Sequence, residues 1–211
     1  MRRILVALAV GALVSIIVPP AAAQSPALKT YNDPKFGVSF RYPAVWNASP
    51  TLSFYLGTTI LERPHPPGGM DHPLMKVGFD RTSRGFAGYL HSTTLDGVEF
   101  TYLALPQTPP AACFARLPEQ DGETRKSDVT IHGVAYKRVQ GGDAGMGHSV
   151  SRNMYAADIG GTCYLFEGGI HTSTGADSAR PLSSTRTLRL QNQLAAVMRS
   201  VTITAGETHQ P

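Results

Sequence analysis

Two segments on either side of residue 160 constrain the fold more than any other part of the sequence. Residues 149–157 and 162–172 are long strand candidates, and Gly160 and Gly161 lie between them. A glycine pair between two such segments is typical of a tight β-hairpin. Because the strands of a hairpin run in opposite directions, we expect an antiparallel sheet built around this pair.

Further strand candidates occur in runs along the chain, where apolar residues alternate with polar ones. They cover residues 36–42, 52–56, 75–79, 98–105, 129–131, 134–139 and 201–203. His132 and Gly133 predict a tight turn, and the glycines between residues 141 and 147 predict a hairpin or a bulge. Residues 62–73 are rich in proline and glycine and predict a loop. Its part from Arg63 to Pro73 is the best candidate for partner contact, although an ordinary surface connection is the simpler interpretation.

Two helices are expected between these strands. Residues 111–117 predict a short helix, with Thr108 as its N-cap and Pro109 in its first turn. A C-terminal helix carries apolar residues at helical spacing, and we expect them to cover one face of the sheet: Leu190, Leu194, Val197 and Met198. Strands in runs with few helices predict the α+β class, an antiparallel β-sheet flanked by a few helices.

The first 23 residues have the form of a secretory signal peptide. Arg2 and Arg3 precede an apolar run over residues 4–18, and residues 19–23 supply helix-breaking prolines and a small-residue cleavage site. The run is shorter than the roughly 20 residues that span a bilayer. We therefore expect cleavage after Ala23, a periplasmic or secreted location, and no membrane span in the mature chain; an uncleaved anchor is the alternative.

Cleavage removes 23 of the 211 residues and leaves 188, enough for one domain with a substantial core. We expect a single α+β domain over residues 24–205 and a flexible tail over residues 206–211. Loss of Arg2 and Arg3 reduces the 19 basic residues to 17 against 15 acidic ones, so the net charge falls from +4 to +2. This balance, without a basic cluster, argues against nucleic-acid binding.

The chain has two cysteines, Cys113 and Cys163. In an oxidising compartment such a pair predicts a disulfide. A redox-active or nucleophilic thiol is the alternative, but no C-x-x-C spacing or neighbouring base accompanies either cysteine. We therefore expect a structural bond.

Residues 31–46 read Tyr-Asn-Asp-Pro-Lys-Phe-Gly-Val-Ser-Phe-Arg-Tyr-Pro-Ala-Val-Trp. This segment resembles the opening of PsbP-like domains, which begin with a Tyr, a Gly-Phe-Ser-Phe-like strand, Tyr-Pro and a Trp. The terminal amphipathic helix and short strand are also similar to that family. The resemblance implies an α/β/α sandwich and a binding or accessory role, and it carries no catalytic residue across.

A polar strip on the long hairpin is the first candidate site. On the second strand Glu167 and His171 share a face with Cys163 and Leu165, while Tyr164, Phe166 and Ile170 share the other face. A Gly160–Gly161 turn places position 154 opposite 167 and position 150 opposite 171. Arg152 and His148 are then expected near Glu167 and His171, as a ligand-binding group, a structural pair, or an acid–base pair.

Two Met-x-His pairs form the second candidate site: Met70 with His72, and Met146 with His148. Thioether and imidazole ligands together suit Cu(I). A copper-binding module is therefore one hypothesis, although chance pairing of these residue types is the simpler interpretation, and we expect no cofactor.

Common catalytic motifs are missing from the sequence. Residues 147–151 fail the G-x-S-x-G pattern because position 151 is Ser, and no H-E-x-x-H, S-x-x-K or P-loop sequence occurs. We therefore predict an exported, non-enzymatic binding or accessory protein for an envelope protein, an extracellular protein or a small ligand. An unrecognised periplasmic hydrolase or ligand-processing enzyme is the alternative.

Overall fold

The structure, a computed structural model, describes residues 27–52, 64–65, 69–70, 72–83, 93–118, 125–145, 147–173 and 180–204. Its helices are α1 (Pro110–Phe114) and α2 (Ser184–Arg199). Its strands are β1 (Leu28–Asp33), β2 (Val38–Pro43), β3 (Asn47–Ser49), β4 (Pro64–His65), β5 (Gly69–Met70), β6 (Met75–Asp80), β7 (Leu95–Leu105), β8 (Arg125–Ile131), β9 (Val134–Gly145), β10 (His148–Ile159), β11 (Thr162–Ser173) and β12 (Thr202–Ile203).

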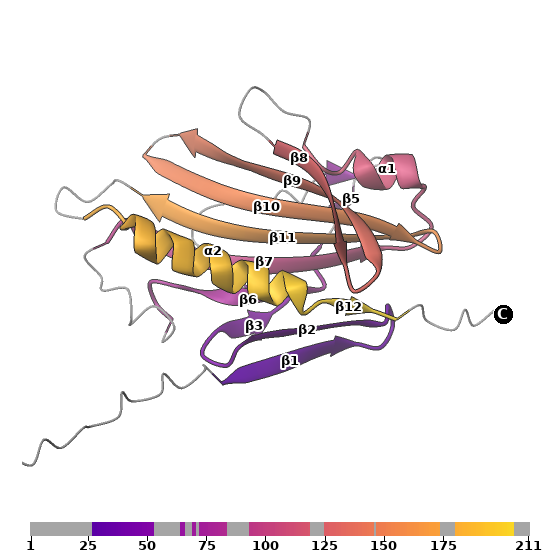
Figure 1. Ribbon diagram of the computed structural model, residues 1–211, viewed down its shortest axis with the longest axis horizontal. Helices are drawn as coiled ribbons and strands as arrows, with labels where there is room; N and C mark the ends of the chain where they lie inside the picture. Colours follow the sequence, from indigo (N-terminus) through magenta and orange to yellow (C-terminus); the bar gives the residue numbers. More distant parts are fainter. Residues whose placement is uncertain are drawn as a thin grey trace, which may run out of the picture.

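An antiparallel sheet in the order β3-β6-β7-β11-β10-β9-β8 forms the centre of the molecule (Figure 1). The hairpin of β10 and β11 turns at Gly160 and Gly161, whose φ angles of 59° and 76° favour glycine. This turn sets Met154 opposite Glu167 and Val150 opposite His171. The hairpin and its register are therefore confirmed.

Helix α2 and a small sheet, in the order β1-β2-β12, cover one face of the large sheet (Figure 1). The four apolar residues predicted for the helix are all buried there. Phe40 of β2 packs against the sheet, with its ring centroid 5.3 Å from that of Phe100 and 6.5 Å from that of Tyr102. These contacts form the main hydrophobic core, and they confirm that the C-terminal helix covers the sheet.

Helix α1 packs on the opposite face, near the turn end of β10 and β11. The sulfur atoms of Cys113 and Cys163 are 1.98 Å apart, so the predicted disulfide is confirmed. Both cysteines are buried with Leu103, Leu165 and their neighbours in a second, smaller apolar cluster. The disulfide fixes the short helix to the start of β11.

Most predicted elements are confirmed, and β7 and β9 are longer than expected. Thr108 as N-cap is wrong: Pro109 occupies that position, and no side chain caps the helix. The strand β1 was not predicted because its residues are mostly polar and exposed; backbone pairing with β2 holds it in place. Within the predicted loop, β4 and β5 pair as a two-stranded ladder.

Several predictions concern parts of the chain outside the described residues. These are the signal peptide, most of the strand expected at residues 52–56, and the C-terminal tail. No helix among the described residues combines the length and the apolar character needed to cross a membrane.

Candidate functional site

The predicted polar strip lies on the sheet face that carries α1, and its members divide into two pairs. Arg152 Nε is 3.0 Å from Glu167 Oε1, as the predicted register implies. His171 does not join this pair, because its Nε2 is 2.8 Å from Oε1 of Glu99. The side chains are almost completely buried, with Glu167 at 0% exposure.

Glu99 was missed by sequence reasoning, although a carboxylate within the otherwise apolar segment 98–105 was a usable signal. The cross-strand register places it opposite Gly169, and the small glycine leaves room for the contact between Glu99 and His171. Lys76 and Thr101 are buried on the same face. In the sheet register, Lys76 is the cross-strand neighbour of Thr101, and Thr101 is the cross-strand neighbour of Glu167. We call these six residues the buried charge layer: Lys76, Glu99, Thr101, Arg152, Glu167 and His171.

The geometry of the buried charge layer favours the structural interpretation of the polar strip. Buried charges are tolerated when they are paired. Arg152 forms an ion pair with Glu167, and His171 is hydrogen-bonded to Glu99. A ligand has no direct access to side chains that are 0–3% exposed, such as Glu167, Glu99 and His171. A ligand-binding role for Arg152, Glu167 and His171 therefore stays a prediction.

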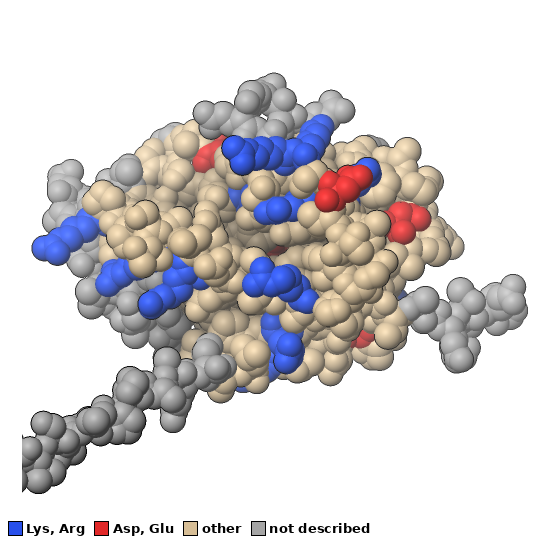
Figure 2. All heavy atoms as spheres, in the orientation of Figure 1, with Lys and Arg blue, Asp and Glu red and all other residues tan. Residues whose placement is uncertain are grey.

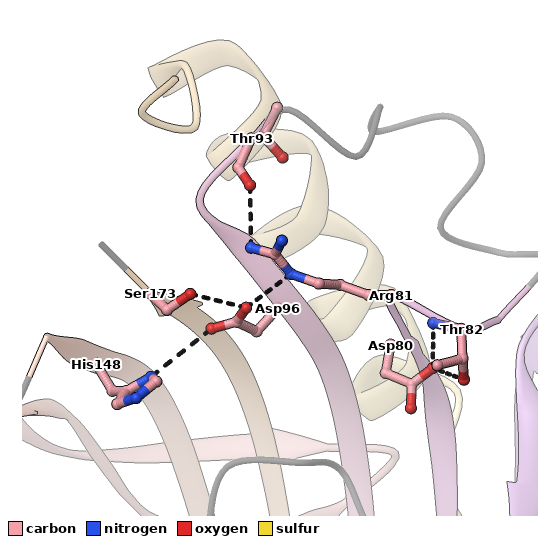
Figure 3. A network of polar contacts seen from close by, with 7 residues as sticks. All are labelled: Asp80, Arg81, Thr82, Thr93, Asp96, His148 and Ser173. Carbon is pink, nitrogen blue, oxygen red and sulfur yellow. Dashed lines mark hydrogen bonds and ion pairs between the residues drawn. The ribbon is translucent and has the colours of Figure 1, made fainter. Parts of the chain in front are cut away.

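His148 begins β10 opposite Ser173, two positions along β11 from His171, and belongs to a separate polar network (Figure 3). Its Nδ1 is 4.0 Å from Oδ2 of Asp96, whose other carboxylate oxygen accepts hydrogen bonds from Arg81 Nε (2.8 Å) and the Ser173 hydroxyl (2.9 Å). Arg81 also donates to the carbonyl of Thr93 at 3.1 Å. This network joins the ends of β6, β7, β10 and β11. His148 and His171 therefore contact different carboxylates, Asp96 and Glu99.

The proposed copper ligands cannot be assembled from the described part of the chain. Met146 and the side chain of Met70 lie outside the described residues, while His72 and His148 are exposed. No group of three or more His, Cys, Asp or Glu side chains within the described ranges is arranged to hold a metal ion. The copper hypothesis stays a prediction.

The structure reveals a different candidate site, a cleft of about 430 Å³ between α2 and strands β8, β9 and β10. Buried apolar side chains form its deepest part: Phe100, Leu194 and Met198. The groups above them are polar and come from both walls: Arg125, Arg138, Gln140, Ser151, Asn153, Gln191 and Asn192. Arg152, Tyr155, Gly141, Gly168, Leu188 and Ala195 complete the lining.

Arg138 is the most constrained polar side chain of this cleft. Its Nη2 donates a hydrogen bond to Oδ1 of Asn153 at 2.8 Å, and its guanidinium carbon lies 5.7 Å from the ring centroid of Tyr155. Burial raises the pKa of Tyr155, although Arg138 and Arg199 favour its ionised form. The Nε of Arg138 is buried and has no hydrogen-bond partner among the residues that the structure describes.

The surface around the cleft is positively charged. Figure 2 shows Lys and Arg side chains gathered on both sides of the hollow between α2 and the neighbouring strands, with fewer acidic ones. Helix α2 contributes Arg186, Arg189 and Arg199 and contains no acidic residue. Sequence reasoning missed this site because its walls come from segments that lie far apart in the chain.

Together, the sheet, α2 and the small sheet form an antiparallel α+β fold, the class that the sequence predicts. No protein-family model and no curated protein sequence matches the chain. Among solved structures, cyanobacterial PsbP (CyanoP) from Synechocystis sp. PCC 6803 is similar at 11% identity, over 89% of this chain and 99% of that one, with a TM-score of 0.38.

Two further solved structures are similar at 13% identity. LpqN, involved in cell envelope biogenesis of Mycobacterium tuberculosis, matches 84% of this chain and 91% of its own, with a TM-score of 0.44. A Bacteroides thetaiotaomicron protein matches 87% of this chain with a TM-score of 0.43, and the chain spans 51% of that protein's length. Similarities at this level concern the fold alone.

Proposed function

We propose that the mature chain is an exported, non-enzymatic binding or accessory protein that holds a small ligand in the cleft between α2 and strands β8–β10. The observation that carries this proposal is a concave site of about 430 Å³ with an apolar floor and convergent polar groups. Pockets of this size and composition are the usual form of small-molecule sites. The leader sequence and the disulfide support export.

The composition of the cleft favours binding over hydrolysis. Ser151 is the one aliphatic hydroxyl among its described lining residues, and no carboxylate or imidazole lines the cleft beside it. A serine nucleophile requires an adjacent base. The hydrolase alternative therefore has no observation in its favour at this site.

Two adjacent alanines on α2 provide a matched test of the site. Ala195 lines the cleft, whereas Ala196 is exposed and does not. We expect small probes (acetate, inorganic phosphate, phenyl phosphate and glucose) to shift amide resonances of residues 151–153 and 188–195 in the wild-type NMR spectrum. Ala195→Met should abolish these shifts and Ala196→Met should preserve them. If no probe shifts these amides, or if both variants respond alike, the cleft is not the binding site.

Export has its own test. Mass spectrometry of the protein purified from its native source should find a chain that begins at Gln24. An intact Met1 end would contradict the proposed location while leaving the cleft proposal unaffected.

A further inference from the structure

We infer that the cleft between α2 and strands β8–β10 selects an organic oxyanion, a small molecule that carries a carboxylate or phosphate next to an apolar group. This inference rests on the proposed function, because it names the chemistry of the ligand for the same site.

The first argument is the charge of the lining. Three arginines line the cleft, namely Arg125, Arg138 and Arg152, and its described lining residues include no Asp or Glu. The ion pair with Glu167 neutralises Arg152. Arg125 and Arg138 are left without a carboxylate partner among the ion pairs of the described residues. An anion is the species that compensates two cations in a recessed site.

The second argument is the geometry of Arg138. The hydrogen bond to Asn153 and the contact with the Tyr155 ring hold its guanidinium in one orientation. The bond to Asn153 uses one N–H of Nη2, and further N–H groups of the guanidinium remain for a ligand. A guanidinium presents these groups as a planar fork that matches the oxygens of a carboxylate or phosphate.

The third argument concerns the part of the ligand that carries no charge. Leu188 lines the cleft and is 56% exposed, above a buried apolar floor of Phe100, Leu194 and Met198. Burial of apolar ligand surface against such a floor is favourable in proportion to its area. An oxyanion without an apolar group would leave Leu188 in contact with water. The cleft therefore fits an amphiphilic anion better than an inorganic one.

Three probes separate these contributions in isothermal titration calorimetry of the mature protein. Phenyl phosphate carries both groups, inorganic phosphate carries only the charge, and benzyl alcohol carries only the apolar ring. We expect phenyl phosphate to bind more tightly than either of the other two.

Charge-neutralising variants locate the anion within the cleft. Arg138→Gln should weaken phenyl phosphate binding about tenfold or more, as expected for the loss of a charge-assisted hydrogen-bonded pair. Arg125→Gln, at an exposed position, should weaken it about threefold and should not disturb folding. The matched control is Arg189→Gln, which removes the same charge from an exposed position of α2 outside the cleft and should change the affinity by less than about twofold.

The outcomes distinguish this inference from the proposed function. If benzyl alcohol binds as tightly as phenyl phosphate, or if the Arg125 and Arg138 variants match the Arg189 control, selection of an anion is refuted, and binding that Ala195→Met abolishes would still support the cleft as a site. If inorganic phosphate binds as tightly as phenyl phosphate, the apolar group is no part of the ligand. If none of the three probes binds, selection of an anion is refuted, and the acetate and glucose arms of the NMR test decide whether the cleft is a binding site.

Discussion

The ion pair between Arg152 and Glu167 permits a quantitative prediction about the buried charge layer. At 3.0 Å the attraction is about 5 kcal/mol for an effective dielectric constant of about 20, and desolvation of the two ions offsets most of it. Glu167 is fully buried, so Glu167→Gln leaves the arginine charge without compensation. We expect this single change to lower the free energy of unfolding by about 3–5 kcal/mol.

Replacement of both Arg152 and Glu167 should lower the free energy of unfolding much less than the single change. The double variant Arg152→Met with Glu167→Leu removes both charges and keeps similar side-chain volumes, so no uncompensated charge is left. Its loss of stability should therefore be smaller than that of Glu167→Gln. An exposed pair serves as the control: Lys137 and Asp128 are 2.7 Å apart but 51% and 71% exposed, and Asp128→Asn should cost at most about 1 kcal/mol.

Urea unfolding followed by tryptophan fluorescence is the appropriate assay. Trp46 is the only tryptophan and is 4% exposed in the folded protein, so its emission reports loss of the core. Free energies of unfolding are compared between variants that have equal m-values, the slope of this free energy against urea concentration. A Glu167→Gln variant within about 0.5 kcal/mol of the wild type would refute the reasoning, as would a double variant that is less stable than the single one.

Three further predictions follow from the described contacts. Cys113→Ala with Cys163→Ala should lower the free energy of unfolding by about 4 kcal/mol, since the bond closes a loop of 50 residues; chemical unfolding of the oxidised and variant proteins measures this. Gly37→Ala should lower the free energy of unfolding by about 1–3 kcal/mol, because φ is +63° and a Cβ would clash with Thr204. Gly133→Ala, at φ +81° in open space, should lower this free energy by less. Burial is the main cause that raises the pKa of five tyrosines: Tyr31, Tyr102, Tyr136, Tyr155 and Tyr164. Folding favours their neutral forms, so this stabilisation is complete below the ordinary tyrosine pKa of 10.0 and is lost as the pH rises above it. The tyrosinate absorbance of these five residues should therefore increase together with unfolding in an alkaline titration. Their gradual ionisation in the folded protein would contradict this.

Local signals predicted the fold well because they are produced by neighbouring residues. The Gly160–Gly161 turn fixes the register of the longest hairpin, and the register in turn places Arg152 beside Glu167. The spacing of Leu190 and Leu194 likewise identifies the buried side of α2. Each of these inferences needs only the geometry of one element or one turn.

The candidate site was not predictable in the same way. The partner of His171 is Glu99, which is 72 residues away in the sequence and belongs to a strand whose position in the sheet no local pattern reveals. The cleft requires α2 to lie against β8–β10, an arrangement decided by packing of the whole core. Arg138 therefore looks, in sequence, like any polar residue of an alternating strand.

The two faces of the large sheet separate stability from binding. Side chains alternate between the two faces along a strand. Met154 of β10 lies opposite Glu167 on the face that carries α1, while the adjacent Tyr155 lies opposite Arg138 on the face of the cleft. A change in the Glu99–His171 pair, which does not line the cleft, should therefore lower stability without altering ligand affinity, and a change at the cleft should do the reverse. Glu99→Gln, measured at a temperature where it stays folded, should bind phenyl phosphate as the wild type does. Arg138→Gln should retain near-wild-type unfolding while losing affinity, and equal effects of the two variants on both quantities would show that the faces are coupled.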